Sequence, residues 1–220
     1  MPTNLPPRTP RRRLPAAERR ELIEQAAIAL FAERGYHGTA IDEIARQAGI
    51  TPPVLYDHFT SKAALHARLL ERTRDELLAM WRQNLGGGGT LEEQLVRAFT
   101  AWAAYVQANP YAPRMFFRES TGVEDIKQAH GAIAADANGA LAAIIGGLTG
   151  SGASADDGGV PATALAMTTE IIRGGLTELA IWWTDHPEIP AEAIVAIAMN
   201  TLWLGFERTI GGERWSPPTP

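Results

Sequence analysis

The sequence contains no cysteine among its 220 residues. Disulfide bonds and thiolate metal sites are therefore excluded, and the absence suits a reducing compartment. No long apolar run is present either, because the longest uncharged helical stretch, 193–206, is 14 residues long. A helix that spans a bilayer needs roughly 20 apolar residues. Four prolines among the first ten residues also argue against the apolar helix of a signal peptide. We expect a cytoplasmic protein without a membrane partner.

Motifs of enzymes are also missing from the sequence. The five histidines form no pair at the helical spacing of a metal site, and none follows a Gly-x-Ser-x-Gly elbow. No phosphate-binding glycine loop precedes a lysine. Ser120, Asp125 and His130 are the nearest approach to a catalytic group, and their spacing is common by chance. We therefore expect no enzyme activity, no metal and no cofactor.

Charge is distributed unevenly along the chain. Residues 1–70 carry ten Lys and Arg against seven Asp and Glu, whereas residues 71–220 carry ten against eighteen. A basic head of net charge +3 thus precedes an acidic body of net charge −8. This asymmetry favours a protein of which only the head meets phosphate groups.

No segment alternates polar and apolar residues with the period of a β-strand, so the predicted fold is all-α with about nine helices. The first helix begins near Pro15 and ends at Gly35, and the fourth runs from Ser61 to Asn84. The third helix begins after Thr51, and the other predicted helices cover residues 40–47, 91–109, 111–118, 123–146, 162–184 and 191–210. The predicted domains are a disordered basic arm (1–14), a helix-turn-helix domain (15–60), a connecting helix (61–84), an effector-binding and dimerisation domain (85–212) and a flexible tail (213–220).

The second and third predicted helices have the pattern of a helix-turn-helix. Thr39 is the expected N-cap of the second helix, with Asp42 at the third helical position. Ala45 is small where the helices cross, and Gly49 permits a left-handed turn. Thr51 is the expected N-cap of the third helix. Any two short helices joined through a glycine can satisfy this spacing, so flanking residues are needed to decide.

Those flanking residues closely resemble the N-terminal signature of the TetR family. The resemblance covers about residues 16–70, and beyond it only the helical pattern and the length agree. The matching positions are Leu30 to Tyr36, Thr39, Ile44, Ala45, Ala48 to Ile50, Leu55, Tyr56, His58, Phe59, Ser61, Lys62 and Leu65. The resemblance implies a DNA-binding transcriptional regulator, a homodimer whose operator is released by a small molecule.

The resemblance also implies which residues meet DNA. Tyr56 is expected toward the DNA backbone, and Lys62 is expected to bind a phosphate at the start of the fourth helix. Two prolines and a valine cannot form bidentate hydrogen bonds, so thymine methyl contacts and DNA shape are expected to dominate base reading. The predicted DNA-binding residues are Thr39, Thr51, Pro52, Pro53, Val54, Tyr56, Asp57, His58 and Lys62. Arg11, Arg12 and Arg13 fit either a minor-groove arm or a solubilising tail.

Aromatic residues from several helices predict an apolar cavity in the body, although each residue taken alone also fits a plain core. The predicted ligand-binding residues are Trp81, Trp102, Tyr105, Phe116, Phe117, Glu170 and Trp182. This set favours a mainly hydrophobic effector. The last two helices are apolar on more than one face and predict a four-helix dimer interface, with Ile194, Ile197, Thr201, Leu202 and Gly205 in it. The alternative is a helical DNA-binding or interaction protein without an effector.

Overall fold

The computed structural model describes residues 14–85, 88–110, 112–113, 124–148 and 162–210, and every regular element within them is a helix. The elements are α1 (Ala16–Gly38), α2 (Ile41–Gln47), α3 (Pro52–Tyr56), α4 (Lys62–Leu85), α5 (Leu91–Ala108), α7 (Glu124–Leu148), α8 (Ala162–Thr184), α9 (Ala191–Ala198) and α10 (Leu204–Ile210). The predicted all-α fold is confirmed. The helix expected at 111–118, the basic arm and the tail lie almost wholly outside the described residues.

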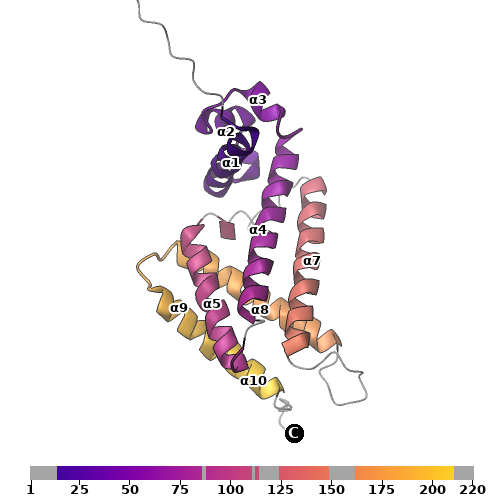
Figure 1. Cartoon of the computed structure of the whole chain (residues 1–220), viewed down its shortest axis with the longest axis vertical. Coiled ribbons are helices and arrows are strands. Elements are labelled where there is room, and N and C mark those ends of the chain that lie inside the picture. The colour runs from indigo at the N-terminus through magenta and orange to yellow at the C-terminus, as the bar shows by residue number, and fades with distance from the viewer. Residues whose placement is uncertain (1–13, 86–87, 111, 114–123, 149–161, 211–220) are drawn as a thin grey trace, which may run out of the picture.

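A small head at one end of the molecule consists of α1, α2, α3 and the start of α4 (Figure 1). Its core joins Ile23, Phe31, Ile44, Leu55 and Leu65, each at most 1% exposed. The backbone of α1 breaks at Gly35, which has a φ of +74°. Because this left-handed conformation suits glycine, the helix ends where the sequence predicts.

The longest helix of the head continues into the body. α4 has 24 residues and is therefore about 36 Å long. Ser61 caps it, since its hydroxyl oxygen accepts a hydrogen bond from the amide of Ala64 at 3.0 Å. Leu65 and Leu69 belong to the core of the head, whereas Trp81 and Leu85 belong to a second core. One unbroken helix thus connects the two.

The second core lies among α4, α5, α8 and α9, with α7 alongside α4 (Figure 1). Its buried aromatic side chains are Trp81, Phe99, Trp102 and Trp183. Between α9 and α10 the chain forms a π-helical turn, Met199–Trp203, so residues 191–210 are continuously helical. No helix in the described part of the chain is long and apolar enough to cross a membrane.

Candidate functional site

The turn between α2 and α3 has the backbone that the sequence predicts. Gly49 has a φ of +69°, and the amide of Ile50 donates to the carbonyl of Ala45 at 2.9 Å. Ile44, Ala45 and Leu55 are fully buried where the helices meet. The helix-turn-helix is therefore present, with α3 as its second helix.

α3 and its flanks form an exposed surface at the end of the head. Pro52 and Pro53 occupy the first helical turn after the N-cap residue Thr51, where their missing N–H groups cost little. Tyr56 is 51% exposed, which is unusual for an aromatic residue and leaves its hydroxyl accessible to a phosphate. Of the predicted DNA-facing residues here, Thr51, Pro53, Tyr56 and Asp57 are exposed, whereas Pro52, Val54 and His58 are half-buried.

The predicted capping role of Thr39 is wrong. α2 begins one residue later than expected, so Ala40 is its N-cap and Glu43 takes the third helical position. The Glu43 carboxylate accepts from the Ala40 amide at 3.1 Å. Thr39 is only 1% exposed, and its hydroxyl is directed at the carbonyls of Leu30 and Gly35, 3.1 and 2.9 Å away. Thr39 therefore secures the end of α1 and is too buried to face DNA.

Lys62 has internal partners in addition to its predicted place at the start of α4. Its ammonium donates to the carbonyls of Tyr36 and Thr39 at 2.8 and 2.9 Å. The same nitrogen lies 4.2 Å from the centre of the Tyr36 ring, within the range of a cation–π interaction. Lys62 thus ties α4 to the last turn of α1 and to the residue that follows it. Its phosphate contact stays a prediction.

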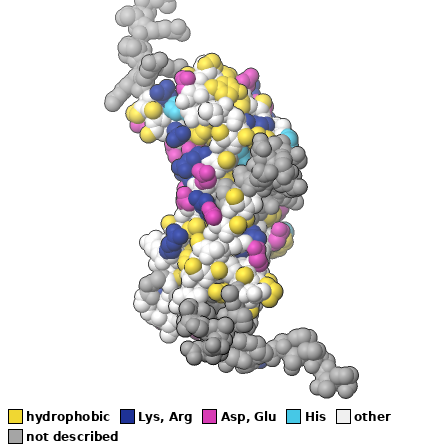
Figure 2. Space-filling view, turned by 90° about the vertical axis from the view of Figure 1, so that its right-hand side faces the viewer, with side chains coloured by type: hydrophobic (Ala, Val, Ile, Leu, Met, Phe, Trp, Pro, Cys, Tyr) yellow, Lys and Arg dark blue, Asp and Glu magenta, His cyan; other side chains and the backbone are white. Residues whose placement is uncertain are grey.

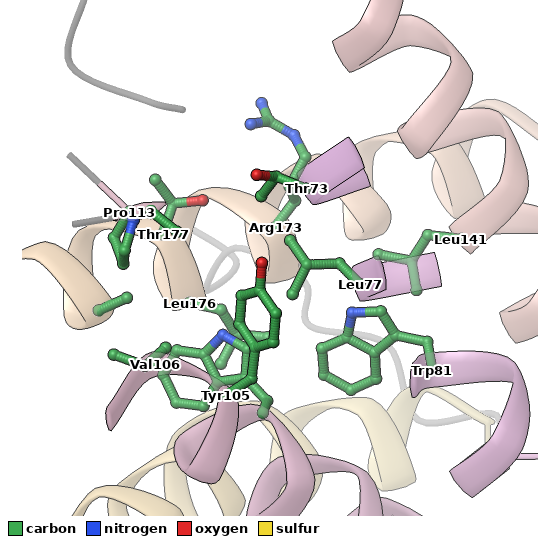
Figure 3. Close-up of a pocket in the computed structure, with 13 residues that line it drawn as sticks. Thr73, Leu77, Trp81, Tyr105, Val106, Pro113, Leu141, Arg173, Leu176 and Thr177 are labelled. Atoms are coloured by element: carbon green, nitrogen blue, oxygen red, sulfur yellow. The ribbon is translucent and has the colours of Figure 1, made fainter. Parts of the chain in front are cut away.

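A mainly apolar cavity lies in the body, between α4, α5, α7 and α8 (Figure 3). About 550 Å³ of space lies within it, including its opening to solvent. Trp81, Trp102 and Tyr105 line it, as predicted. The other lining residues are Thr73, Leu77, Val106, Ala112, Pro113, Leu141, Arg173, Leu176, Thr177 and Ala180.

Tyr105 supplies a polar group in this apolar surrounding. Its side chain projects into the cavity with the hydroxyl toward Thr73 and Leu77 of α4 (Figure 3). The hydroxyl donates to the Glu76 carboxylate at 3.0 Å. Burial, reinforced by the negative charge of Glu76, raises the pKa of Tyr105 above its ordinary value of 10.0. The phenol is therefore neutral and acts as a donor at physiological pH.

Two predicted ligand-binding residues lie outside this cavity, and two others cannot be placed. Glu170 pairs with Arg173 at 2.7 Å and also with Asn138, so it serves an internal contact between α7 and α8. Trp182 is 46% exposed and stacks on His186, with ring centres 4.0 Å apart. Trp182 is on the exposed side of α8 and Glu170 lies one turn before Arg173, and neither of them lines the cavity, so their assignment to it is wrong. Phe116 and Phe117 lie outside the described residues.

Three polar residues of the cavity wall were not predicted from the sequence: Thr73, Arg173 and Thr177. Thr73 precedes Leu77 and Trp81 by one and two turns, so it shares their face of α4. On α8, Arg173 and Thr177 share a face with Leu176 in the same way. Helical spacing from the predicted aromatic residues would have identified Thr73. The residues of α8 that line the cavity include no aromatic residue, so the aromatic pattern did not predict that face.

Comparison with known proteins assigns the head. The family profile described as "Bacterial regulatory proteins, tetR family" matches residues 23–69, which span most of α1, all of α2 and α3, and the start of α4. Residues 23–69 are thus similar to the bacterial regulators of the TetR family. The predicted resemblance is thereby confirmed.

Individual relatives are similar to this chain over different lengths. The HTH-type transcriptional activator FasR from Mycolicibacterium smegmatis is 38% identical over 105 residues, and the match covers 48% of each protein. The chain thus matches about half the length of this curated relative. A TetR-like regulator from Rhodococcus sp. RHA1 has a TM-score of 0.70 at 23% identity, over 91% of this chain and 100% of that one. FadR from Bacillus subtilis, solved with stearoyl-CoA, has a TM-score of 0.65 at 20% identity, over 88% and 99%.

An apolar face formed by α8, α9 and α10 is exposed in the single chain. Met167, Ile171 and Trp182 of α8 are 58%, 68% and 46% exposed, and their spacing places them on one side of the helix. Ile197 and Leu204 are 50% and 49% exposed. We call these five residues the apolar face. Single exposed apolar residues are ordinary, but a row along these helices is typical of an interface.

The predicted interface residues divide into three groups. Ile197, Thr201 and Gly205 are exposed and Leu202 is half-buried. Ile194 is only 2% exposed and packs in the core of the body, so its assignment to a subunit interface is wrong. A side chain that is already buried against its own helices has no surface left for a partner.

Proposed function

We propose that this protein is a transcriptional regulator that binds operator DNA as a homodimer through the helix-turn-helix of its head. The proposal depends mainly on α3, which lies at the end of the head and carries the exposed side chain of Tyr56. This helix lies within the segment that matches the family profile. Tyr56 supplies a phosphate contact, while Pro53 and Asp57 are the exposed side chains nearest the bases. Contacts to thymine methyl groups and DNA shape dominate the reading of sequence.

Selection from random-sequence DNA with the purified protein tests this proposal. We expect an enriched inverted repeat whose half-sites lie about 34–36 Å apart, or a multiple of that distance, as two-fold dimers require. Tyr56→Ala should weaken binding to every enriched sequence, because a phosphate contact carries no base preference. Asp57→Ala should instead alter the preferred bases. Recovery of no common sequence by wild-type protein would exclude the proposal.

The partner that completes the apolar face is a second copy of the same chain. Pairing of α8, α9 and α10 from two copies would bury the five residues of the face and place two heads on one DNA duplex. A dimer also explains how a five-residue α3 becomes selective, because two half-sites double the contacts. The same proposal places the protein in the cytoplasm, with its DNA.

The cavity of the body binds a mainly hydrophobic effector. Its wall is apolar except for Tyr105, Thr73, Thr177 and Arg173, so a ligand with a long apolar part and one polar end fits its chemistry. Stearoyl-CoA occupies the structure of B. subtilis FadR, whose fold this chain shares. Long-chain acyl-CoA compounds are therefore the first probes, followed by other apolar and aromatic compounds.

Effector binding is tested by melting temperature and operator release together. A compound present at 100 times its dissociation constant should stabilise the folded protein by about 2.7 kcal/mol. Ala180→Leu, which adds atoms to the cavity wall, should reduce that stabilisation. Thr100→Val on the exposed side of α5 is a control that should not. Operator binding that no compound changes would favour a regulator without an effector.

We propose that effector binding releases the operator and relieves repression. The curated relative FasR is named an activator, so the sign of control needs its own experiment. A reporter gene behind the selected operator should be less active when the protein is present and recover when a stabilising compound is added. Higher reporter activity with the protein would assign an activator instead.

A further inference from the structure

A chain of hydrogen bonds runs from the cavity wall to the first helix of the head. Tyr105 of α5 donates to Oε2 of Glu76 at 3.0 Å. The other oxygen of Glu76, Oε1, accepts from Nε of Arg72 at 2.8 Å. Nη1 of Arg72 in turn reaches Oε2 of Glu21 at 2.7 Å and Oε2 of Glu24 at 2.8 Å, both on α1. We call these five residues the relay.

Arg72 is the centre of the relay because it serves three carboxylates in two directions. Its Nε faces the body and its Nη1 faces α1, a division that the rigid fork of a guanidinium permits and a lysine ammonium does not. The hydrogen bonds that Arg72 donates to Glu21, Glu76 and Glu24 raise the pKa of Arg72 further above its ordinary value. The side chain of Glu24 is only 4% exposed. A buried carboxylate that lost this partner would be strongly destabilised.

The relay lies where the head meets the body. Figure 2 shows acidic and basic side chains side by side in a column at this junction. Arg72, Glu76 and Tyr105 also line a second, open groove of about 700 Å³, which reaches Gln25 and Ile28 of α1. Tyr105 is thus a wall between the cavity on one side and the groove on the other.

A ligand in the cavity would meet the ring of Tyr105 directly. The hydroxyl that the ring carries is the donor to Glu76, so displacement of the ring separates the two. Glu76 would then lose the hydrogen bond from Tyr105 and keep the one from Arg72. The strength of the Arg72 hydrogen bond to Glu76, relative to its hydrogen bonds to Glu21 and Glu24 on α1, would therefore change. Networks with two alternative hydrogen-bond arrangements can couple distant sites in this way.

We propose that Tyr105 reports occupancy of the cavity to the head, and that Glu76 and Arg72 pass the change to Glu21 and Glu24 on α1. The inference rests on the proposed function, because it takes the cavity as the effector site and the head as the DNA reader. It adds a route from α5 across α4 to α1, in which individual side chains reorganise. Tyr105 is a positioning residue in this account.

Tyr105→Phe is the decisive variant, because it keeps the ring in the cavity and removes only the donor. Thr100→Val is its matched control, since it removes a hydroxyl from the exposed side of the same helix, α5, away from the cavity. In the ligand-free protein, Tyr105→Phe should shift the amide resonances of α1 around Glu21–Gln25 and raise their hydrogen-exchange rates. Thr100→Val should leave them as in wild type.

A double-mutant cycle separates a relay from two local effects. Arg72→Lys keeps the charge but loses the fork, so it should raise exchange in α1 as Tyr105→Phe does. The double variant should exchange no faster than the more affected single variant, because both break the same chain. Full additivity of the two effects would overturn the proposal, and so would α1 amides that Tyr105→Phe does not move.

The functional arm uses stearoyl-CoA as the probe and the selected DNA as the reporter. Allosteric couplings are typically about 5- to 150-fold in affinity. In Tyr105→Phe, stearoyl-CoA should still quench tryptophan fluorescence but should change DNA affinity less than about twofold, while Thr100→Val keeps the wild-type response. A full response in Tyr105→Phe would overturn the relay and leave the proposed function intact. If wild-type protein binds neither DNA nor the probe, the proposed function fails, and the α1 amides alone still decide the relay.

Discussion

Lys62 shows how one side chain can combine a predicted position with an unexpected role. Its place at the first residue of α4 follows from the sequence, and a helix N-terminus there attracts phosphate. The structure adds two carbonyl acceptors, one in the last turn of α1 and one in the residue that follows it. These contacts join segments more than twenty residues apart, which no local pattern of the sequence reveals. Lys62 therefore contributes to the stability of the head in addition to any contact with DNA.

Lys62→Met should destabilise the protein by about 1–2 kcal/mol, because it leaves two carbonyls without their charged donor. The urea midpoint should fall while its slope stays constant. Arg46→Met is the matched control, since Arg46 is a 78% exposed cation of the same head and should change stability little. An unchanged midpoint in Lys62→Met would show that the internal contacts contribute nothing. A loss of about 0.9 from the log–log salt slope of DNA binding would establish the phosphate contact.

Glu21 gives the head a defined dependence on acid. The hydrogen bond from Arg72 lowers the pKa of Glu21 below its ordinary value of 4.5. A carboxylate with a lowered folded-state pKa stabilises the protein above its unfolded value and loses this effect as pH falls through the folded value. The melting temperature should thus be steady from about pH 7 to 5 and fall below about 4.5. The difference between wild type and Glu21→Gln should shrink over that acidic range, and a constant difference would contradict the assignment.

Among the helices, the last one explains why the predicted interface was partly wrong. A regular period of 3.6 residues from Ile194 leads to Ile197, Thr201, Leu202 and Gly205. The π-turn at Met199–Trp203 inserts an extra residue and changes the phase of the helix. Ile194 and Trp203 therefore both face the core, while Leu204 joins Ile197 on the exposed side. Sequence periodicity alone does not reveal such a turn.

Leu204→Asp should split the dimer without unfolding the subunit, because Leu204 is exposed in the single chain and lies on the apolar face. Val96→Asp is the matched control, since Val96 is a 41% exposed apolar residue of α5 outside that face. Sedimentation at micromolar concentration should give a monomer for Leu204→Asp and a dimer for Val96→Asp. A dimer in both variants would place the interface elsewhere.

Helix boundaries were predictable at several caps and breakers, although Thr39 is not the cap that the sequence predicts. Ser61, Gly35 and Gly49 act as the sequence indicates, and α8 begins and ends at the predicted residues. The cavity was predictable only through its large aromatic residues. Its remaining wall depends on which helices lie side by side, and spacing within one helix does not contain that information.

In the assembled protein, α4 and the relay offer two distinct ways to connect cavity and head. α4 contacts both cores and is unbroken from Lys62 to Leu85, so a push at Trp81 can travel along it as a rigid lever. The relay instead uses the side chains of Arg72 and Glu76, in the middle of α4, to connect Tyr105 of α5 with α1. The two routes respond differently to a change in the helix backbone.

Arg74→Gly tests the lever, with Arg74→Ala as its control. Both variants lose the ion pair with Asp136 of α7, but only glycine softens the helix, at a cost of about 1 kcal/mol relative to alanine. A lever predicts that Arg74→Gly binds effector normally and releases DNA poorly, while Arg74→Ala releases it as wild type does. Equal release by both variants would exclude the lever and favour the relay as the route.

The most direct measurement of the central claim is a thermodynamic cycle on one sample of wild-type protein. A compound that raises the melting temperature is titrated with and without saturating operator, and the operator is titrated with and without saturating compound. If cavity and head belong to one regulator, the compound raises the dissociation constant for operator, and the operator raises that for the compound by the same factor. A compound that binds in the cavity and leaves operator affinity unchanged would contradict the account.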